Sequence, residues 1–68
     1  MDADNLVRMA NRIADFFAAM PDHTEAVEGV AMHIGKFWEP RMKQQLQQLL
    51  HGAEAGRLHP LVLEAMKA

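Results

Sequence analysis

Residues 5–21 decide the first half of the fold, and they read NLVRMANRIADFFAAMP. Apolar side chains recur there at helical spacing, so the stretch predicts an amphipathic helix over residues 5–20. Pro21 is expected to end this helix because it lacks an amide hydrogen and restricts the residue before it. Asp2 or Asp4 is placed to cap the first turn, where the helix dipole favours a negative charge. The side chains expected to face the core are Leu6, Met9, Ala10, Ile13, Phe17 and Met20.

The apolar arc of this first helix is wider than one packing face needs. Val7, Ala14 and Ala18 lie beside the core-facing side chains and widen the arc. A helix with this pattern has more apolar surface than one neighbouring helix covers, which favours a second contact outside the chain.

A second helix is predicted over residues 24–38. Asp22 followed by Glu25 resembles a capping box with Asp in place of Ser or Thr, and Thr24 is the alternative cap. The side chains expected to face the core are Val27, Val30, Ala31, Ile34, Phe37 and Trp38.

Two further helices complete an all-α fold. Prolines suit the first turns of a third helix over residues 41–50 and of a short fourth helix over residues 60–67. Residues 52–59 between them contain two glycines and are expected to form a flexible linker. No stretch alternates apolar and polar residues for long, so strands are not expected. We therefore expect a single helical domain over residues 1–68, a small bundle of three main helices plus a short C-terminal helix.

The chain is short, close to neutral and free of cysteine. It has 68 residues, a formal charge of -2 and 50% hydrophobic residues, a balance typical of a globular domain. The lack of cysteine excludes disulfides, thiolate zinc sites and iron–sulfur ligation in this chain. A core of this size rarely supplies more than about 3–5 kcal/mol. Burial against another chain is therefore expected to contribute to stability.

The N-terminal residues do not resemble a targeting segment. Asp2 and Asp4 stand where a signal peptide carries basic residues. No apolar run approaches the roughly 20 residues that a membrane span needs. We expect a cytoplasmic protein with no membrane partner.

The sequence contains no recognisable catalytic or metal-binding pattern. Serine, cysteine and tyrosine are absent, so the usual nucleophiles are missing. None of the four histidines pairs with a second ligand at a familiar zinc spacing, and there is no glycine-rich phosphate loop. We expect no catalytic, cofactor-binding or metal site, and the chain is not expected to be an enzyme. His33, in the middle of the second helix, is expected to be a partly buried or interface histidine.

A small helical regulator that binds nucleic acid is the less favoured alternative. Arg8 and Arg12 share one side of the first helix, and Lys36, Arg41 and Lys43 cluster further on. Acidic residues interleave with both groups, whereas a recognition helix exposes several basic and amide side chains together. Solvated helix surface is the better interpretation, and no nucleic-acid partner is expected.

Protein binding is the function that the residue types favour, through two surfaces. Gly29 and Met32 place bare backbone and an apolar side chain on a part of the second helix that should be polar. Trp38 beside Phe37 adds a large aromatic group of the kind enriched in interfaces, with a core position as its alternative. The first surface comprises Arg8, Asn11, Arg12 and Asp15. The second comprises Gly29, Met32, His33, Lys36 and Arg41.

Several runs of residues carry a family resemblance over nearly the whole chain. They are NLVRMAN at 5–11, FF at 16–17, EAVEGVA at 25–31, HI at 33–34, KFWEPRM at 36–42 and PLV at 60–62. With these runs the chain resembles the small delta subunit of cytoplasmic, NAD-dependent, molybdenum-containing formate dehydrogenases. Gly35 departs from the family's pattern, which has a longer polar or basic residue there, and His59 stands in place of a small N-cap.

The resemblance implies a non-catalytic accessory subunit that associates with the large catalytic alpha subunit. Such a subunit supports assembly, cofactor maturation or stability of the complex. It holds no cofactor itself, whereas the implied complex uses molybdenum cofactor, iron–sulfur clusters, FMN and NAD. A homodimer of the isolated chain stays open. The alternative is a free homodimeric assembly chaperone for the same enzyme.

Overall fold

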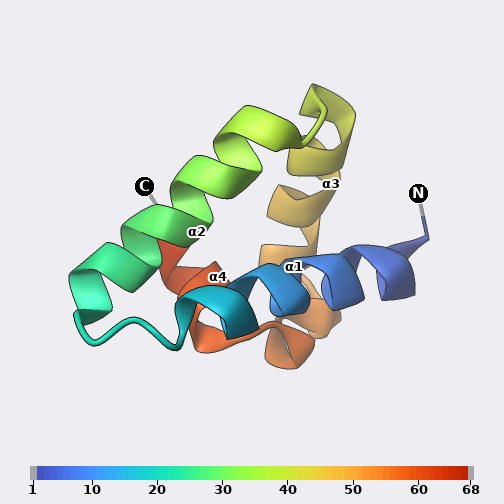
Figure 1. The fold of residues 1–68 in the computed structure, drawn as a ribbon. Helices are drawn as coiled ribbons and strands as arrows, with labels where there is room; N and C mark the ends of the chain where they lie inside the picture. Colours follow the sequence, from blue (N-terminus) through green and yellow to red (C-terminus); the bar gives the residue numbers. More distant parts are fainter. Residues whose placement is uncertain (1, 68) are drawn as a thin grey trace.

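Residues 2–67, which the computed structural model describes, form four α-helices and one 3₁₀ helix (Figure 1). The bounds are α1 Ala3–Phe17, α2 His23–Phe37, α3 Pro40–Leu50, η1 Ala53–Arg57 and α4 Pro60–Ala65. The described residues contain no strand, and the predicted all-α fold of three main helices plus a short fourth is confirmed. Every helix within these residues is too short or too polar to cross a bilayer.

The helices surround one core. In Figure 1, α1 and α2 diverge like the arms of a V from the loop that joins them, and α3 descends on the open side of the V. The short helix α4 packs against both arms, most extensively against α2. α3 and α4 both pack against α1, and α4 also packs against α2, so α4 lies where the first two helices meet the rest of the chain.

The starts of α1 and α2 follow the predicted capping. The Asp2 carboxylate accepts from the amide of Asp4 at 3.1 Å. The Asp22 carboxylate accepts from the amides of Thr24 at 2.8 Å and Glu25 at 3.2 Å, so Asp22 is the cap of α2. These bonds satisfy amide hydrogens that have no partner inside the helix.

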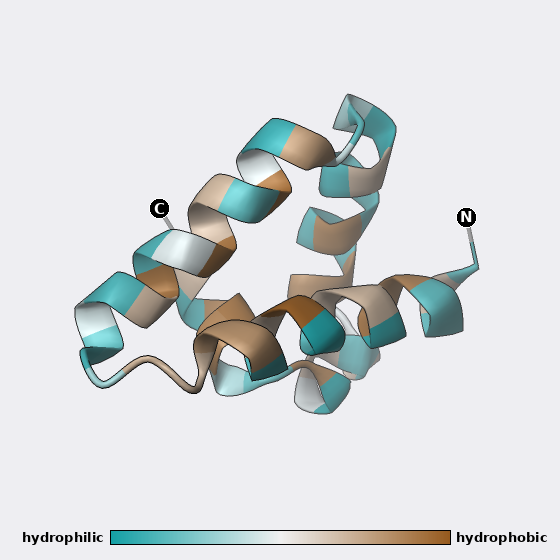
Figure 2. Ribbon diagram, in the orientation of Figure 1, coloured by the Kyte–Doolittle hydropathy of each residue, from teal (hydrophilic) through white to brown (hydrophobic). Residues whose placement is uncertain are grey.

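The first helix ends earlier than predicted, at Phe17. The amide of Ala19 donates to the carbonyl of Phe16 and that of Met20 to the carbonyl of Phe17, at 3.4 and 3.0 Å. These shorter-range bonds tighten the last turn and lead the chain out before Pro21. Met20 therefore lies in the loop and is exposed, and its predicted place in the core is wrong. Figure 2 shows the hydrophobic colouring continuing past α1 into this loop.

Most of the segment predicted as a flexible linker, residues 52–59, folds as η1. Leu58 directly after η1 is buried in the core. The His59 side chain then caps α4, its Nδ1 accepting from the amide of Leu61 at 3.0 Å. His59 thus caps α4 in place of the small N-cap residue that the family pattern has at this position. These contacts join the segment to the rest of the chain, and its glycines gave no sign of them.

The core draws on every α-helix. Trp38 is buried, with 6% of its surface exposed, whereas Phe37 is 72% exposed. The prediction that Phe37 faces the core is therefore wrong, and Ala26, which was not expected in the core, is buried there. The buried side chains are Leu6, Val7, Ala10, Ala14, Ala26, Val30, Ile34, Trp38, Leu46, Leu58, Leu61, Val62 and Ala65.

Replacing Leu46 by alanine is expected to lower the free energy of unfolding by about 2–5 kcal/mol, because the side chain is fully buried and truncation leaves a cavity. Such a loss rivals the whole stability of a core this small. Thermal unfolding followed by circular dichroism measures it. Gln48→Ala, at an exposed position on the same helix, is the control and should change stability by less than about 0.5 kcal/mol. Equal melting temperatures for the two variants would place Leu46 outside the core.

Candidate partner-binding surfaces

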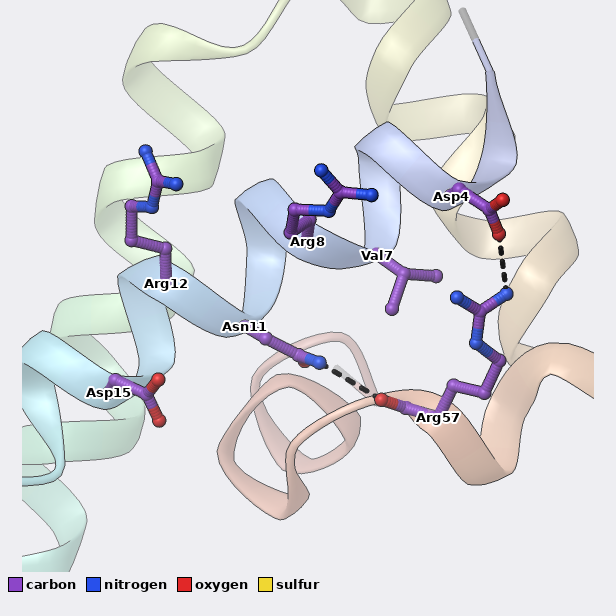
Figure 3. Close-up of a pocket in the computed structure, with 7 residues that line it drawn as sticks. All are labelled: Asp4, Val7, Arg8, Asn11, Arg12, Asp15 and Arg57. Atoms are coloured by element: carbon purple, nitrogen blue, oxygen red, sulfur yellow. Dashed lines mark hydrogen bonds and ion pairs between the residues drawn. The ribbon is translucent and has the colours of Figure 1, made fainter.

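The four residues of the first predicted surface lie together on one side of α1. Arg8, Asn11, Arg12 and Asp15 line a hollow of about 370 Å³, which we call the charged hollow (Figure 3). The other residues that line it are Asp4, Val7 and Arg57. The structure thus brings this predicted group together, and adds η1 to it.

Asn11 uses its side chain inside the chain. Its Nδ2 donates to the carbonyl of Arg57 at 2.9 Å, and its Oδ1 accepts from the amide of His59 at 2.8 Å. One side-chain amide therefore satisfies a backbone acceptor at the end of η1 and a backbone donor directly before α4. Asn11 holds the fold together, and we leave it out of the binding surface.

Arg57 joins η1 to the start of α1. Its Nη1 donates to Asp4 Oδ1 at 2.7 Å and to Glu54 Oε2 at 2.9 Å. The hydrogen bond and charge of Arg57 hold the pKa of Asp4 below its ordinary value, and the bonds to Asp4 and Glu54 raise the pKa of Arg57. Sequence reasoning missed Arg57, since a pair 53 positions apart leaves no periodic signal.

Arg8 and Arg12 are the exposed cations of the charged hollow. Figure 3 shows both guanidinium groups projecting away from the Asn11–Arg57 hydrogen bond. Within residues 2–67 neither forms an ion pair, whereas Asp15 lies 3.8 Å from His59 Nε2. Both arginines therefore keep their full donor set for a ligand or a partner.

Four residues of the second predicted surface share one side of α2. Gly29, Met32, His33 and Lys36 follow the spacing i, i+3, i+4 and i+7, which places them on adjoining turns. Met32 is 60% exposed and His33 is half-buried. Arg41 begins a different helix and lines a polar hollow with Gln44, Gln45 and Gln48 on α3.

Gly29 allows the close approach of another residue of this chain, the Phe17 side chain. A Cβ atom at this position would clash with ring atoms of Phe17, Cδ1 the nearest of them. The Phe17 ring therefore occupies the space beside Gly29 that the sequence suggested as bare backbone. Trp38 likewise belongs to the core, its stated alternative, and offers little surface to a partner.

Aromatic rings form a continuous row across α1 and α2. Phe16 and Phe17 pack edge to face with centroids 5.1 Å apart, Phe17 and His33 lie 6.4 Å apart, and His33 and Phe37 lie 4.9 Å apart. Phe16 is 74% exposed, about as much as Phe37. Together with Met32 these residues make up what we call the aromatic surface: Phe16, Phe17, Met32, His33 and Phe37.

The aromatic surface contains a hollow of its own. This aromatic hollow, of about 280 Å³, is lined by Arg12, Ile13, Phe16, Phe17 and His33. Sequence reasoning did not single out Phe16, although two adjacent phenylalanines on one helix cannot both face the same core. That simple geometric signal was available.

Known proteins were compared with the chain. The family described as "NADH-dependant formate dehydrogenase delta subunit FdsD" matches residues 5–66. The chain belongs to this family. The predicted resemblance to the delta subunit is thereby confirmed over nearly the whole chain. No curated protein and no solved structure matches it.

The FdsD family match covers both surfaces. It includes α2, α3, η1 and α4 and all of α1 except its first two residues, Ala3 and Asp4. Within residues 2–67, no three side chains of the His, Asp and Glu types gather in a way that could hold a metal ion.

The contact between Phe17 and Gly29 predicts opposite effects of the same substitution at two glycines of α2. Gly35→Ala is expected to raise the free energy of unfolding by about 0.5–1 kcal/mol, because a Cβ there meets nothing within 4 Å and alanine favours a helix. Gly29→Ala is expected to lose that gain and to lower stability, since the Phe17 ring must move. Urea unfolding of both variants measures the difference. An equal stabilisation at both positions would contradict the tight contact.

The lowered pKa of Asp4 predicts a pH-dependent effect of Asp4→Asn. The ion pair stabilises the fold above the pKa that Asp4 has in the unfolded chain, and this contribution disappears as the pH falls through the lower pKa of the folded state. The stability difference between wild type and Asp4→Asn should therefore shrink on acidification. Urea unfolding over a pH series measures it. In an Arg57→Gln background the same substitution should have little effect at any pH, and a pH-independent difference would argue against the pair.

Proposed function

We propose that this chain is a non-catalytic accessory subunit that binds the catalytic alpha subunit of an NAD-dependent, molybdenum-containing formate dehydrogenase. In this proposal it supports assembly, cofactor maturation or stability of that enzyme. The observation that carries the proposal is the FdsD family match over residues 5–66, combined with an aromatic surface that this chain leaves uncovered.

The exposed rings support a role in binding another protein. Aromatic residues, methionine and arginine are the types enriched in the cores of protein interfaces. Phe16, Met32 and Phe37 are more than half exposed, which is unusual for three large apolar side chains in so small a molecule. Arg8 and Arg12 can add two-pronged hydrogen bonds to carboxylates or carbonyls of the partner.

The redox chemistry of the complex is assigned to the other subunits. Iron–sulfur clusters need thiolate ligands, and this chain has no cysteine. The residues of this chain do not fit such a cluster, and we derive no step of formate oxidation or electron transfer through them.

The proposed mechanism is stabilisation by mass action. A subunit that binds only the folded or cofactor-loaded alpha subunit increases the population of that state. At a free concentration 100 times the dissociation constant the gain is about 2.7 kcal/mol. That is enough to favour a loaded alpha subunit over an open or partly folded one by roughly a hundredfold.

The test is to produce the formate dehydrogenase subunits with and without this chain. With the chain present, we expect more cofactor-loaded alpha subunit per total alpha subunit, measured as molybdenum and iron content. Activity per loaded enzyme and the KM for formate should be unchanged, because the chain does not contact the substrate. A changed KM with an unchanged cofactor content would contradict the proposal.

The stoichiometry of the purified active enzyme separates a permanent subunit from a free assembly chaperone. An affinity tag on the alpha subunit should retain one copy of this chain in the active complex, measured by native mass spectrometry. A chain that is found only with cofactor-free alpha subunit would favour the chaperone instead.

A further inference from the structure

We propose that the aromatic surface is the docking site of this chain, and that its occupant is an apolar segment of the catalytic subunit that carries a carboxylate beside its anchoring side chain. This inference rests on the proposed function and names the surface and the chemistry of the partner. The charged hollow is then a flank of the interface, and the contact is centred on the rings.

The rings are held in place before any partner arrives. The Phe17 ring sits over Gly29, and its edges meet Phe16 on one side and His33 on the other. His33 in turn meets Phe37. Ordering side chains at an interface costs free energy, so a row of rings that is already packed keeps more of its contact energy for binding. Phe16 and Phe37, at the two ends of the row, remain mostly exposed and are the expected anchors.

The buried core residues of α1 are not part of the aromatic surface. The core side of α1 is formed by Leu6, Val7, Ala10 and Ala14, which are all buried. Ile13 and Phe17 are half-buried and pack against this core, whereas Phe16 is 74% exposed. The exposed rings of the aromatic surface, Phe16 on α1 and Phe37 on α2, are thus apolar groups that the four short helices leave uncovered.

The charges around the aromatic hollow specify the partner. Arg12 is the one charged side chain among the described residues that line it, and Lys36 follows His33 by one turn of α2. Neither forms an ion pair within residues 2–67. An apolar side chain that enters the hollow would bring its neighbours close to Arg12, so a carboxylate next to it gains a charge-assisted hydrogen bond. Electrostatic complementarity of this kind selects the partner and its orientation.

A second copy of the chain fits this site less well. A two-fold symmetric contact presents the same surface on both sides. If it were centred on the aromatic hollow, Arg12 of one copy would face Arg12 of the other, with no carboxylate lining either hollow. Like charges placed opposite one another oppose association.

The first experiment measures the affinity of this chain for the purified catalytic subunit by biolayer interferometry. Phe16→Ala and Phe37→Ala should each weaken binding by about 30-fold, the usual effect of removing an interface hot spot. Both positions are exposed, so circular dichroism should show an unchanged fold. Met20→Ala is the matched control, because Met20 is an exposed large apolar residue outside the aromatic surface. Its affinity should equal that of the wild type.

The second experiment tests the carboxylate of the partner. Arg12→Glu should abolish binding at low salt, whereas Arg12→Lys should retain much of it, because the positive charge is kept. Lys67→Glu, at an exposed position after α4, changes the net charge equally and should leave the affinity within about twofold. An equal loss for Arg12→Glu and Lys67→Glu would show a general charge effect and overturn the specific contact.

The outcomes separate this inference from the proposed function. If wild type binds and the Phe16 and Phe37 variants bind equally well, the aromatic surface is not the docking site, while the accessory role stands. If wild type does not bind the catalytic subunit at all, the proposed function itself fails. If analytical ultracentrifugation finds a dimer that Phe37→Ala dissociates and that the catalytic subunit does not displace, a second copy is the occupant and the inference is overturned.

Discussion

The placement of the Phe17 ring over Gly29 is the contact on which the rest of the structure depends. It brings the end of α1 against the middle of α2 at a distance where a Cβ on residue 29 would clash with the ring. With this crossing in place, α1 turns Leu6 and Ala10 toward the core. The same crossing leaves Phe16 outside, so one contact determines both what is buried and what is offered to a partner.

Features that depend on neighbours in sequence could be predicted. The helices at both sides of the 18–22 loop and the caps at Asp2 and Asp22 follow from spacing and from side chains two or three positions away. The all-α class follows from the same local patterns. These features need no knowledge of where the chain goes next.

Features that depend on distant segments could not be predicted. Asn11 looks like a surface polar residue until η1 lies beside it, and Arg57 has no recognisable partner until it meets Asp4. Phe37 and Trp38 are adjacent and both aromatic, and the end of α2 between them decides which one is buried. Helical spacing alone predicted both side chains in the core, because spacing does not show at which residue α2 ends.

The exposure of Phe16 and Phe37 has a consequence for the cell that makes this subunit. Aromatic rings that bind another polypeptide stay exposed when that polypeptide is scarce. Surplus copies of the small subunit would then aggregate or be degraded. Synthesis of the two subunits in equal amounts would avoid such surplus copies. On the proposed docking, the aromatic surface would couple the lifetime of the small subunit to the abundance of the large one.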